Sequence, residues 1–137
     1  MFDERLREIK TGVYNERSNE EYHAFYESNE ERFYKAPEGG ENLSEVRRRA
    51  MDFLYDVEQK HHGKNILIIT HEYPSWMLAA GSKGATVPEA AAMKTVGKNF
   101  IKTADFISLS FRPFPHNHDY ELDFHRPYID KIKFPCS

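Results

Sequence analysis

The sequence predicts an α/β fold, because an amphipathic helix is followed directly by a short apolar strand and then by a second helix. Between residues 43 and 60, apolar side chains recur on one face of a 3.6-residue period. Residues 65–70, NILIIT, hold a run of consecutive Ile and Leu residues. A short run that is apolar on both faces is typical of a parallel strand covered on both sides. Pro74 then suits the first turn of a helix, where its missing N–H costs nothing.

The N-terminal part of the chain predicts one irregular stretch, one helix and one loop. Residues 1–17 are expected to be irregular or weakly extended. Ser18 with Glu21 three residues later forms a capping-box pattern. Aromatic residues at roughly helical spacing then predict a helix over residues 19–33. Pro and Gly residues in KAPEGGEN predict a loop over residues 35–42.

The central helix has a signal at each end. Asn42 and Glu45 repeat the capping-box pattern, and Gly63 follows the last turn. The next helix, SWMLAAG, is expected to be short, and PEAAAM is expected to form another helical turn. Residues 105–111, DFISLSF, alternate in polarity and predict a strand. We therefore expect a domain over residues 1–112 and an appended segment over residues 113–137.

Composition excludes several classes of protein. The chain has 137 residues, of which 39% are hydrophobic and 30% charged, with a net charge of −3. No apolar run approaches a membrane span, and no broad basic stripe suits a nucleic acid. Cys136 is the single cysteine, so neither an internal disulfide nor a paired-cysteine zinc site can form within the chain. We expect a cytoplasmic protein with no metal, no cofactor and no membrane contact.

Two residues carry candidate chemistry. His71 follows the predicted strand 65–70, and ligands of open α/β sheets bind beyond the carboxyl ends of parallel strands. The next helix N-terminus offers amides and partial positive charge to an anion, and a histidine there can bind a phosphoryl oxygen or act as nucleophile or base. Glu8, in the charged stretch 3–12, is a candidate proton donor for a departing alcohol. The alternatives are a histidine that merely caps the turn and a charged stretch that is solvated surface.

Three motifs resemble a known family. LREIKTG, PEGGENLSEVRRRAMDFL and ILIITHE occur in the order and spacing of the histidine phosphatase superfamily, the phosphoglycerate-mutase-like fold, over about residues 3–111. The resemblance implies a partial three-layer phosphoglycerate-mutase-like sheet with flanking helices. It implies that Glu8 is the proton donor and that His71 is the second active-site histidine. The residues that match the family's Gly-Glu-Ser-like turn and helical arginine are Gly40, Glu41, Asn42 and Arg49.

The sequence also departs from the family pattern. It contains no Arg-His-Gly triplet, which supplies the family's nucleophile, and Glu72 stands where the family has glycine. A carboxylate beside a phosphate pocket is unfavourable unless it points away or binds a cationic partner. Arg5 and Glu72 are the candidate substrate-binding residues. The expected ligand is a small phosphorylated substrate or inorganic phosphate.

The missing strand has a structural consequence. In the family the Arg-His-Gly motif lies at the end of the first strand, so a chain without this part lacks a central strand, and its sheet keeps an unpaired edge that favours association. We therefore expect either a homo-oligomer or a missing N-terminal partner segment that repairs the sheet.

The tail carries a second resemblance. Residues 120–137, YELDFHRPYIDKIKFPCS, resemble a short segment of isoleucyl-tRNA synthetase. This resemblance implies an alternative function, a non-catalytic accessory or inserted domain of such a synthetase. Contact with nucleic acid would then occur only through the parent synthetase.

Overall fold

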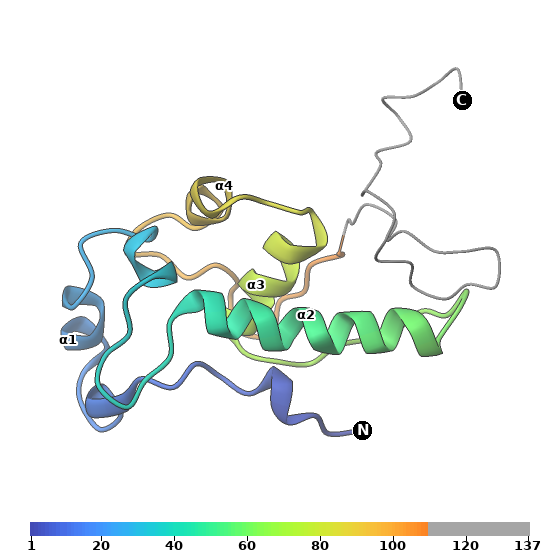
Figure 1. Cartoon of the computed structure of the whole chain (residues 1–137), viewed down its shortest axis with the longest axis horizontal. Helices are drawn as coiled ribbons and strands as arrows, with labels where there is room; N and C mark the ends of the chain where they lie inside the picture. Colours follow the sequence, from blue (N-terminus) through green and yellow to red (C-terminus); the bar gives the residue numbers. More distant parts are fainter. Residues whose placement is uncertain (110–137) are drawn as a thin grey trace, which may run out of the picture.

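The computed structural model describes residues 1–109, which form helices and turns joined by extended segments (Figure 1). The α-helices are α1 (Asn19–Ala24), α2 (Leu43–Lys60), α3 (Glu72–Ser82) and α4 (Val87–Ala92). Short 3₁₀ turns are η1 (Glu4–Leu6), η2 (Gly12–Tyr14) and η3 (Glu31–Phe33). The predicted appended segment 113–137, with its synthetase-like string and Cys136, lies outside the described residues.

Helix α2 confirms the predicted central helix. Asn42 and Glu45 each bond the other's backbone N–H at 2.9 Å, which completes the expected capping box. The helix ends at Lys60. Its apolar face packs on α3, and η1 lies against the same helix. The buried residues on that face are Leu43, Val46, Ala50, Phe53 and Leu54.

Helix α1 is shorter than predicted. The capping box of Ser18 and Glu21 is present, but α1 ends at Ala24 instead of continuing to residue 33. The buried Asn29 side chain donates to the carbonyl of Lys94 at 2.6 Å and to that of Ala91 at 3.3 Å. Because this long-range bonding ties the chain to the end of α4, tertiary contacts override local helical spacing here.

Helices α3 and α4 form the rest of the core. Helix α3 begins at Glu72, two residues before Pro74, and nearly all of it is buried. The indole Nε1–H of Trp76 donates to the carbonyl of Ala90 at 2.8 Å, which joins α3 to α4. A side chain at Gly81 would collide with Met51 of α2, so glycine permits close approach of the two helices.

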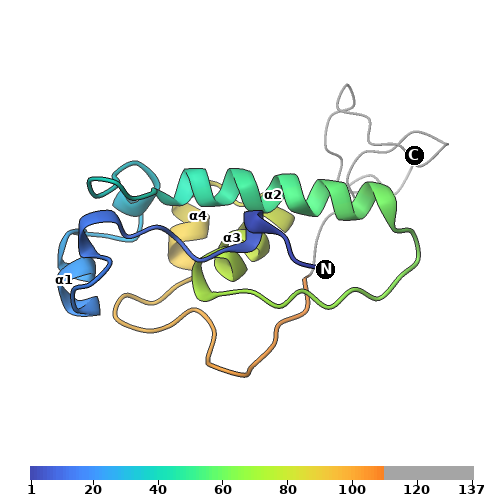
Figure 2. The ribbon, with the colours of Figure 1, turned by 90° about the horizontal axis from the view of Figure 1, so that it is seen from below.

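The predicted sheet is not formed, so the α/β expectation of a partial three-layer phosphoglycerate-mutase-like sheet is wrong for the described residues. Neither residues 65–70 nor residues 105–109 form a strand, and the one β-bridge among the described residues joins Thr11 to Gly40. Both segments run as extended chain on one side of the helices (Figure 2). A strand requires a neighbouring strand to take its backbone hydrogen bonds, and none lies beside either segment within residues 1–109. The local β pattern is present, but residues 1–109 supply no strand to pair with it.

No helix within residues 1–109 is long and apolar enough to cross a membrane.

Candidate functional site

The N-terminal stretch that carries Glu8 is held in place by an arginine of α2. Nη1 of Arg49 donates to the carbonyl oxygens of Arg5 and Arg7, both at 2.7 Å. Nη2 of Arg49 donates to the carbonyl of Glu8 at 3.4 Å. An otherwise irregular stretch is thereby fixed against a rigid helix.

Glu41 completes this clamp. Its carboxylate accepts from Arg7 at 3.0 and 2.9 Å, from Arg49 at 3.2 and 3.1 Å, and from the backbone N–H of Lys10 at 3.0 Å. Burial alone would raise the pKa of Glu41, but the bonds from Arg7 and Arg49 outweigh it and lower the pKa to about 2. The clamp therefore stays ionised at neutral pH.

Two loops cross closely at Gly12, and this crossing brings Glu41 next to the stretch that carries Glu8. Gly12 has a φ of +57°, a left-handed conformation that favours glycine. Val13 N–H donates to the Glu38 carbonyl at 3.0 Å, and a Cβ at position 12 would meet backbone atoms of residues 38–40. This close approach sets the two loops side by side.

The Glu8 carboxyl group sits in a partly buried setting. Its Oε1 accepts from the backbone N–H of Ile9 at 2.8 Å. Burial raises the pKa of Glu8, while the Ile9 N–H, the His71 charge and the Tyr73 N–H partly oppose the rise. A carboxyl group with a raised pKa holds its proton closer to neutral pH, as a proton donor requires.

His71 stands exposed at the entry to α3. It is the N-cap residue, and its carbonyl accepts from the Ser75 N–H at 3.0 Å. The imidazole makes no capping hydrogen bond to the helix, so capping does not account for its placement. His71 lies close enough to Glu8 to act on its pKa, which it lowers.

The two predicted substrate-binding residues are engaged with protein groups. Oε1 of Glu72 accepts from the Phe100 N–H at 2.8 Å and pairs with Nζ of Lys94 at 3.8 Å. The Glu72 carboxylate thus has a cationic partner, which is one of the two conditions under which a carboxylate is tolerated beside a phosphate pocket. Arg5 pairs with Asp3 at 2.8 Å and with Asp56 at 2.6 Å, and these bonds raise its pKa. Substrate binding by Arg5 and Glu72 stays a prediction.

Arg32 is a buried arginine that contacts Tyr73 of α3, and it was not predicted from the sequence. Arg32 is 6% exposed, and its Nη2 lies 2.8 Å from Nδ1 of His23. Its Nη1 donates to the Tyr73 hydroxyl at 3.3 Å, and its guanidinium lies 4.3 Å from the centre of the Tyr26 ring. Sequence alone shows only a charged run at this position, since the partners are distant along the chain.

Lys94 is the second buried cation in this region. It is 6% exposed, and burial lowers its pKa while the Glu72 carboxylate opposes that shift. Tyr73 links the two regions, because its backbone N–H acts on Glu8 while its hydroxyl meets Arg32. Tyr73 is thus the residue that contacts both the Glu8 stretch and the buried Arg32.

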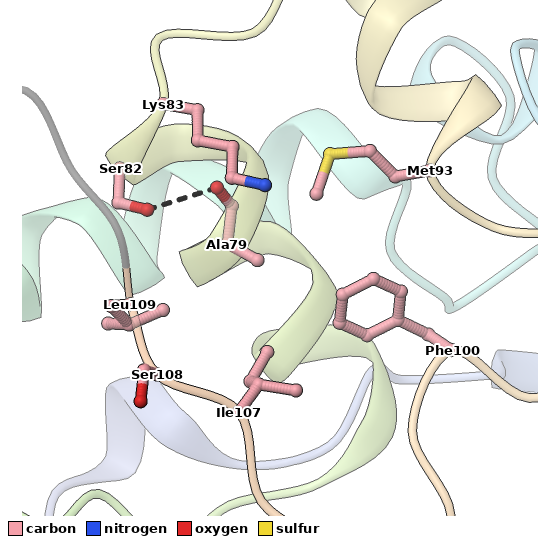
Figure 3. Close-up of a pocket in the computed structure, with 8 residues that line it drawn as sticks. All are labelled: Ala79, Ser82, Lys83, Met93, Phe100, Ile107, Ser108 and Leu109. Atoms are coloured by element: carbon pink, nitrogen blue, oxygen red, sulfur yellow. Dashed lines mark hydrogen bonds between the residues drawn. The ribbon is translucent and has the colours of Figure 1, made fainter.

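A separate groove lies beside α3 and shares no residue with this site. Its volume is about 370 Å³, and it lies between the helix and residues 107–109 (Figure 3). Phe100, Met93 and Ile107 give it apolar walls, and Lys83 lies at one edge. Among the described residues, its lining includes no carboxylate and no histidine.

The described part of the chain contains no cluster of three or more His, Cys, Asp or Glu residues that could hold a metal ion.

Comparison with known proteins supports the resemblance. The family "Histidine phosphatase superfamily (branch 1)" matches residues 1–101. A metal-independent phosphoserine phosphatase of Arabidopsis thaliana is 34% identical over 56 residues, which is 41% of this chain and 23% of that protein. The matched part thus spans about a quarter of that relative's length. The family match ends before the synthetase-like tail begins.

Proposed function

Since the chain belongs to the histidine phosphatase superfamily (branch 1), we propose that it supplies the proton-donor and phosphate-binding half of a phosphoryl-transfer site. Glu8 protonates the leaving group, and His71 stabilises the phosphoryl group in transfer. The substrate is a phosphate monoester. The nucleophilic histidine comes from outside these 137 residues, because no Arg-His-Gly triplet occurs in them.

The observation that carries the proposal is the placement of Glu8. Its carboxyl group is partly buried, its pKa is raised, and its backbone is fixed by Arg49. A solvated surface carboxylate would show neither burial nor such an anchor. The nearby His71 imidazole is free of capping bonds and lies at a helix N-terminus, where an anion is favoured.

The proposed chemistry balances around these two groups. A histidine nitrogen forms a bond to phosphorus while the bond from phosphorus to the ester oxygen breaks. Glu8 gives its proton to that oxygen, which leaves as an alcohol. His71 donates a hydrogen bond to a phosphoryl oxygen as negative charge develops there. Water then attacks the phosphorus and gives a proton to the Glu8 carboxylate, the bond between phosphorus and the histidine nitrogen breaks, and inorganic phosphate leaves.

The name of the relative suggests the substrate to test first. The Arabidopsis protein is described as a phosphoserine phosphatase. Phosphoserine has an alkoxide leaving group, which depends on a proton donor far more than an aryloxide does. We therefore extend the proposal to alkyl phosphates of this kind.

The test supplies the missing nucleophile as free imidazole. The purified chain is assayed with an aryl phosphate and with phosphoserine, with and without imidazole, beside His71→Ala and Glu8→Gln. We expect no turnover without imidazole and chain-dependent turnover with it. His71→Ala should remove that turnover for both substrates, while Glu8→Gln should affect phosphoserine more strongly.

Matched controls are available for both variants. His61→Ala changes an exposed histidine at the end of α2, and Glu4→Gln changes an exposed carboxylate in η1. Turnover that persists in His71→Ala, or that falls equally in His61→Ala, would contradict the assignment. Turnover without imidazole would show that a nucleophile exists within the chain.

The tail supports a second proposal of a different class. The HRPYID string in residues 120–137 suggests an accessory role in an isoleucyl-tRNA synthetase. The mass of the native polypeptide, measured on material from its source, tests this role. A mass of 16.1 kDa would contradict insertion in a synthetase.

A further inference from the structure

Helix α1 lies at one end of the described fold, and Arg32 is its main polar contact (Figure 1). Nη2 of Arg32 lies 2.8 Å from Nδ1 of His23, which belongs to α1. The same guanidinium lies 5.5 Å from the centre of the Tyr22 ring and 4.3 Å from that of Tyr26. A helix of six residues is marginal by itself in water, so the order of α1 depends on tertiary contacts such as these.

The contact between Arg32 and His23 fixes the protonation state of the histidine. A guanidinium has only N–H donors and cannot be deprotonated in a protein. The ring nitrogen that faces it at 2.8 Å therefore has to accept, so Nδ1 of His23 carries no proton and the imidazole is neutral. A protonated imidazole has two donors and no acceptor, so it cannot make this hydrogen bond.

Arg32 has few other acceptors to replace His23. It is 6% exposed, and none of the ion pairs within residues 1–109 includes it. Its Nε is buried without an acceptor in the same part of the chain. The Tyr73 hydroxyl, at 3.3 Å, would then be the one side-chain acceptor left to Arg32 among the described residues. A buried guanidinium with one acceptor and a second cation beside it is strongly unfavourable.

The groups around His23 favour its neutral form. Burial lowers the pKa of His23, and the positive charges of Arg32 in η3 and Lys94 after α4 lower it further. The carboxylates of Glu72, at the start of α3, and Glu20, within α1, act in the opposite direction. His23 itself is exposed at the surface, so a proton reaches it without prior unfolding.

We propose that His23 and Arg32 form an acid-sensitive latch that holds α1 on the core. At neutral pH the hydrogen bond between the two side chains keeps the latch closed. When His23 gains a proton, the bond breaks and α1 detaches, while α2 and α3 stay folded. Opening uncovers the rings of Tyr22 and Tyr26, which are 4% and 8% exposed in the closed form.

The direction of the pH dependence follows from the two states of the latch. In the open state His23 has its ordinary pKa of 6.5, whereas in the closed state its pKa is lower. The open state therefore binds the proton more tightly, so acid favours opening as the pH falls below 6.5. Because one proton is taken up, the opening equilibrium increases by at most about tenfold per pH unit.

Amide hydrogen exchange of the full chain, measured by NMR and corrected for intrinsic rates, tests the latch. The amides of Tyr22, Phe25 and Tyr26 each donate to a backbone carbonyl of this region. We expect their protection to fall about threefold or more between about pH 7 and about pH 5, while the amides of α2 keep theirs. The imidazole titration of His23 in the same samples should give a pKa below 6.5.

Two variants separate the latch from other effects of acid. His23→Gln keeps an oxygen that accepts from Arg32 but cannot gain a proton, so the amides of α1 should stay protected throughout the range. His61→Gln changes an exposed histidine at the end of α2 and should keep the pH dependence of the wild-type chain.

Three results would overturn the proposal. The first is protection of α1 that does not change with pH in the wild-type chain, or that falls together with the protection of α2. The second is a His23→Gln variant with the wild-type pH dependence. The third is a pKa of 6.5 or above for His23, which is measured on the wild-type chain and so does not require that any variant folds.

Discussion

Replacement of Arg49 by methionine should destabilise the chain strongly. The Arg49 side chain is 13% exposed and pairs with Glu41, which is 12% exposed. The same guanidinium donates to three backbone carbonyls. Hydrogen bonds from a charged group contribute about 1.5–3 kcal/mol each, and loss of one partner of a buried pair costs about 3–5 kcal/mol. Because these bonds share one group, they do not add, and we expect a loss of about 3–4 kcal/mol.

Urea unfolding followed by circular dichroism measures this loss. Arg48→Met is the matched control, since Arg48 is exposed on the same helix, and it should change stability by less than about 0.5 kcal/mol. Arg49→Lys keeps the charge but loses the planar fork, and we expect a loss of about 1.5–2.5 kcal/mol. If Arg49→Met does not fold, the unfolding of Arg49→Lys still tests the prediction.

A free energy of unfolding for Arg49→Met within about 1 kcal/mol of the wild-type value would contradict this role of Arg49. The stretch that carries Glu8 would then be held by other contacts. A loss in Arg48→Met as large as that in Arg49→Met would equally contradict the assigned role.

Three further predictions concern the same region. The pKa of Glu41 is lowered in the folded chain, so its stabilisation is present above pH 4.5 and is lost as pH falls toward about 2. Acid titration of unfolding should show this loss, and Glu41→Gln should remove most of it. The pKa of Glu8 is raised, so its ionisation opposes folding at neutral pH, and Glu8→Gln should raise the urea midpoint at pH 7. An unchanged or lower midpoint would contradict the burial of this carboxyl group. Gly12→Ala should cost about 2–4 kcal/mol, from left-handed strain and backbone collision, and a thermal midpoint near that of wild type would count against the loop crossing.

Local signals predicted where α1 and α2 begin, and they predicted the full length of α2 but not that of α1. The capping boxes at Ser18 and Asn42 involve residues three apart, and the apolar period of α2 lies within one segment. The family resemblance matched Glu41 and Arg49 to one turn-and-helix motif, but it did not predict the ion pair that the structure shows between them. The capping boxes and the apolar face of α2 could be predicted because the residues involved lie close together in the sequence.

Long-range features could not be predicted in this way. The strand signal in residues 65–70 was read correctly as extended chain but wrongly as part of a sheet, because no neighbouring strand pairs with it within residues 1–109. Asn29 shortened α1 through bonds to residues more than sixty positions away. Arg32 gained its role from Tyr73, another distant residue. None of these partners is visible from local pattern.

The central claim is that Glu8 and His71 together form a phosphate-binding acid site. The most direct test is an NMR titration of the folded chain with inorganic phosphate. We expect the imidazole signals of His71 and the amide signals of Glu8 and Tyr73 to shift together, and we expect the amide shifts to vanish in His71→Ala. Shifts confined to other residues, or none in a folded chain, would contradict it.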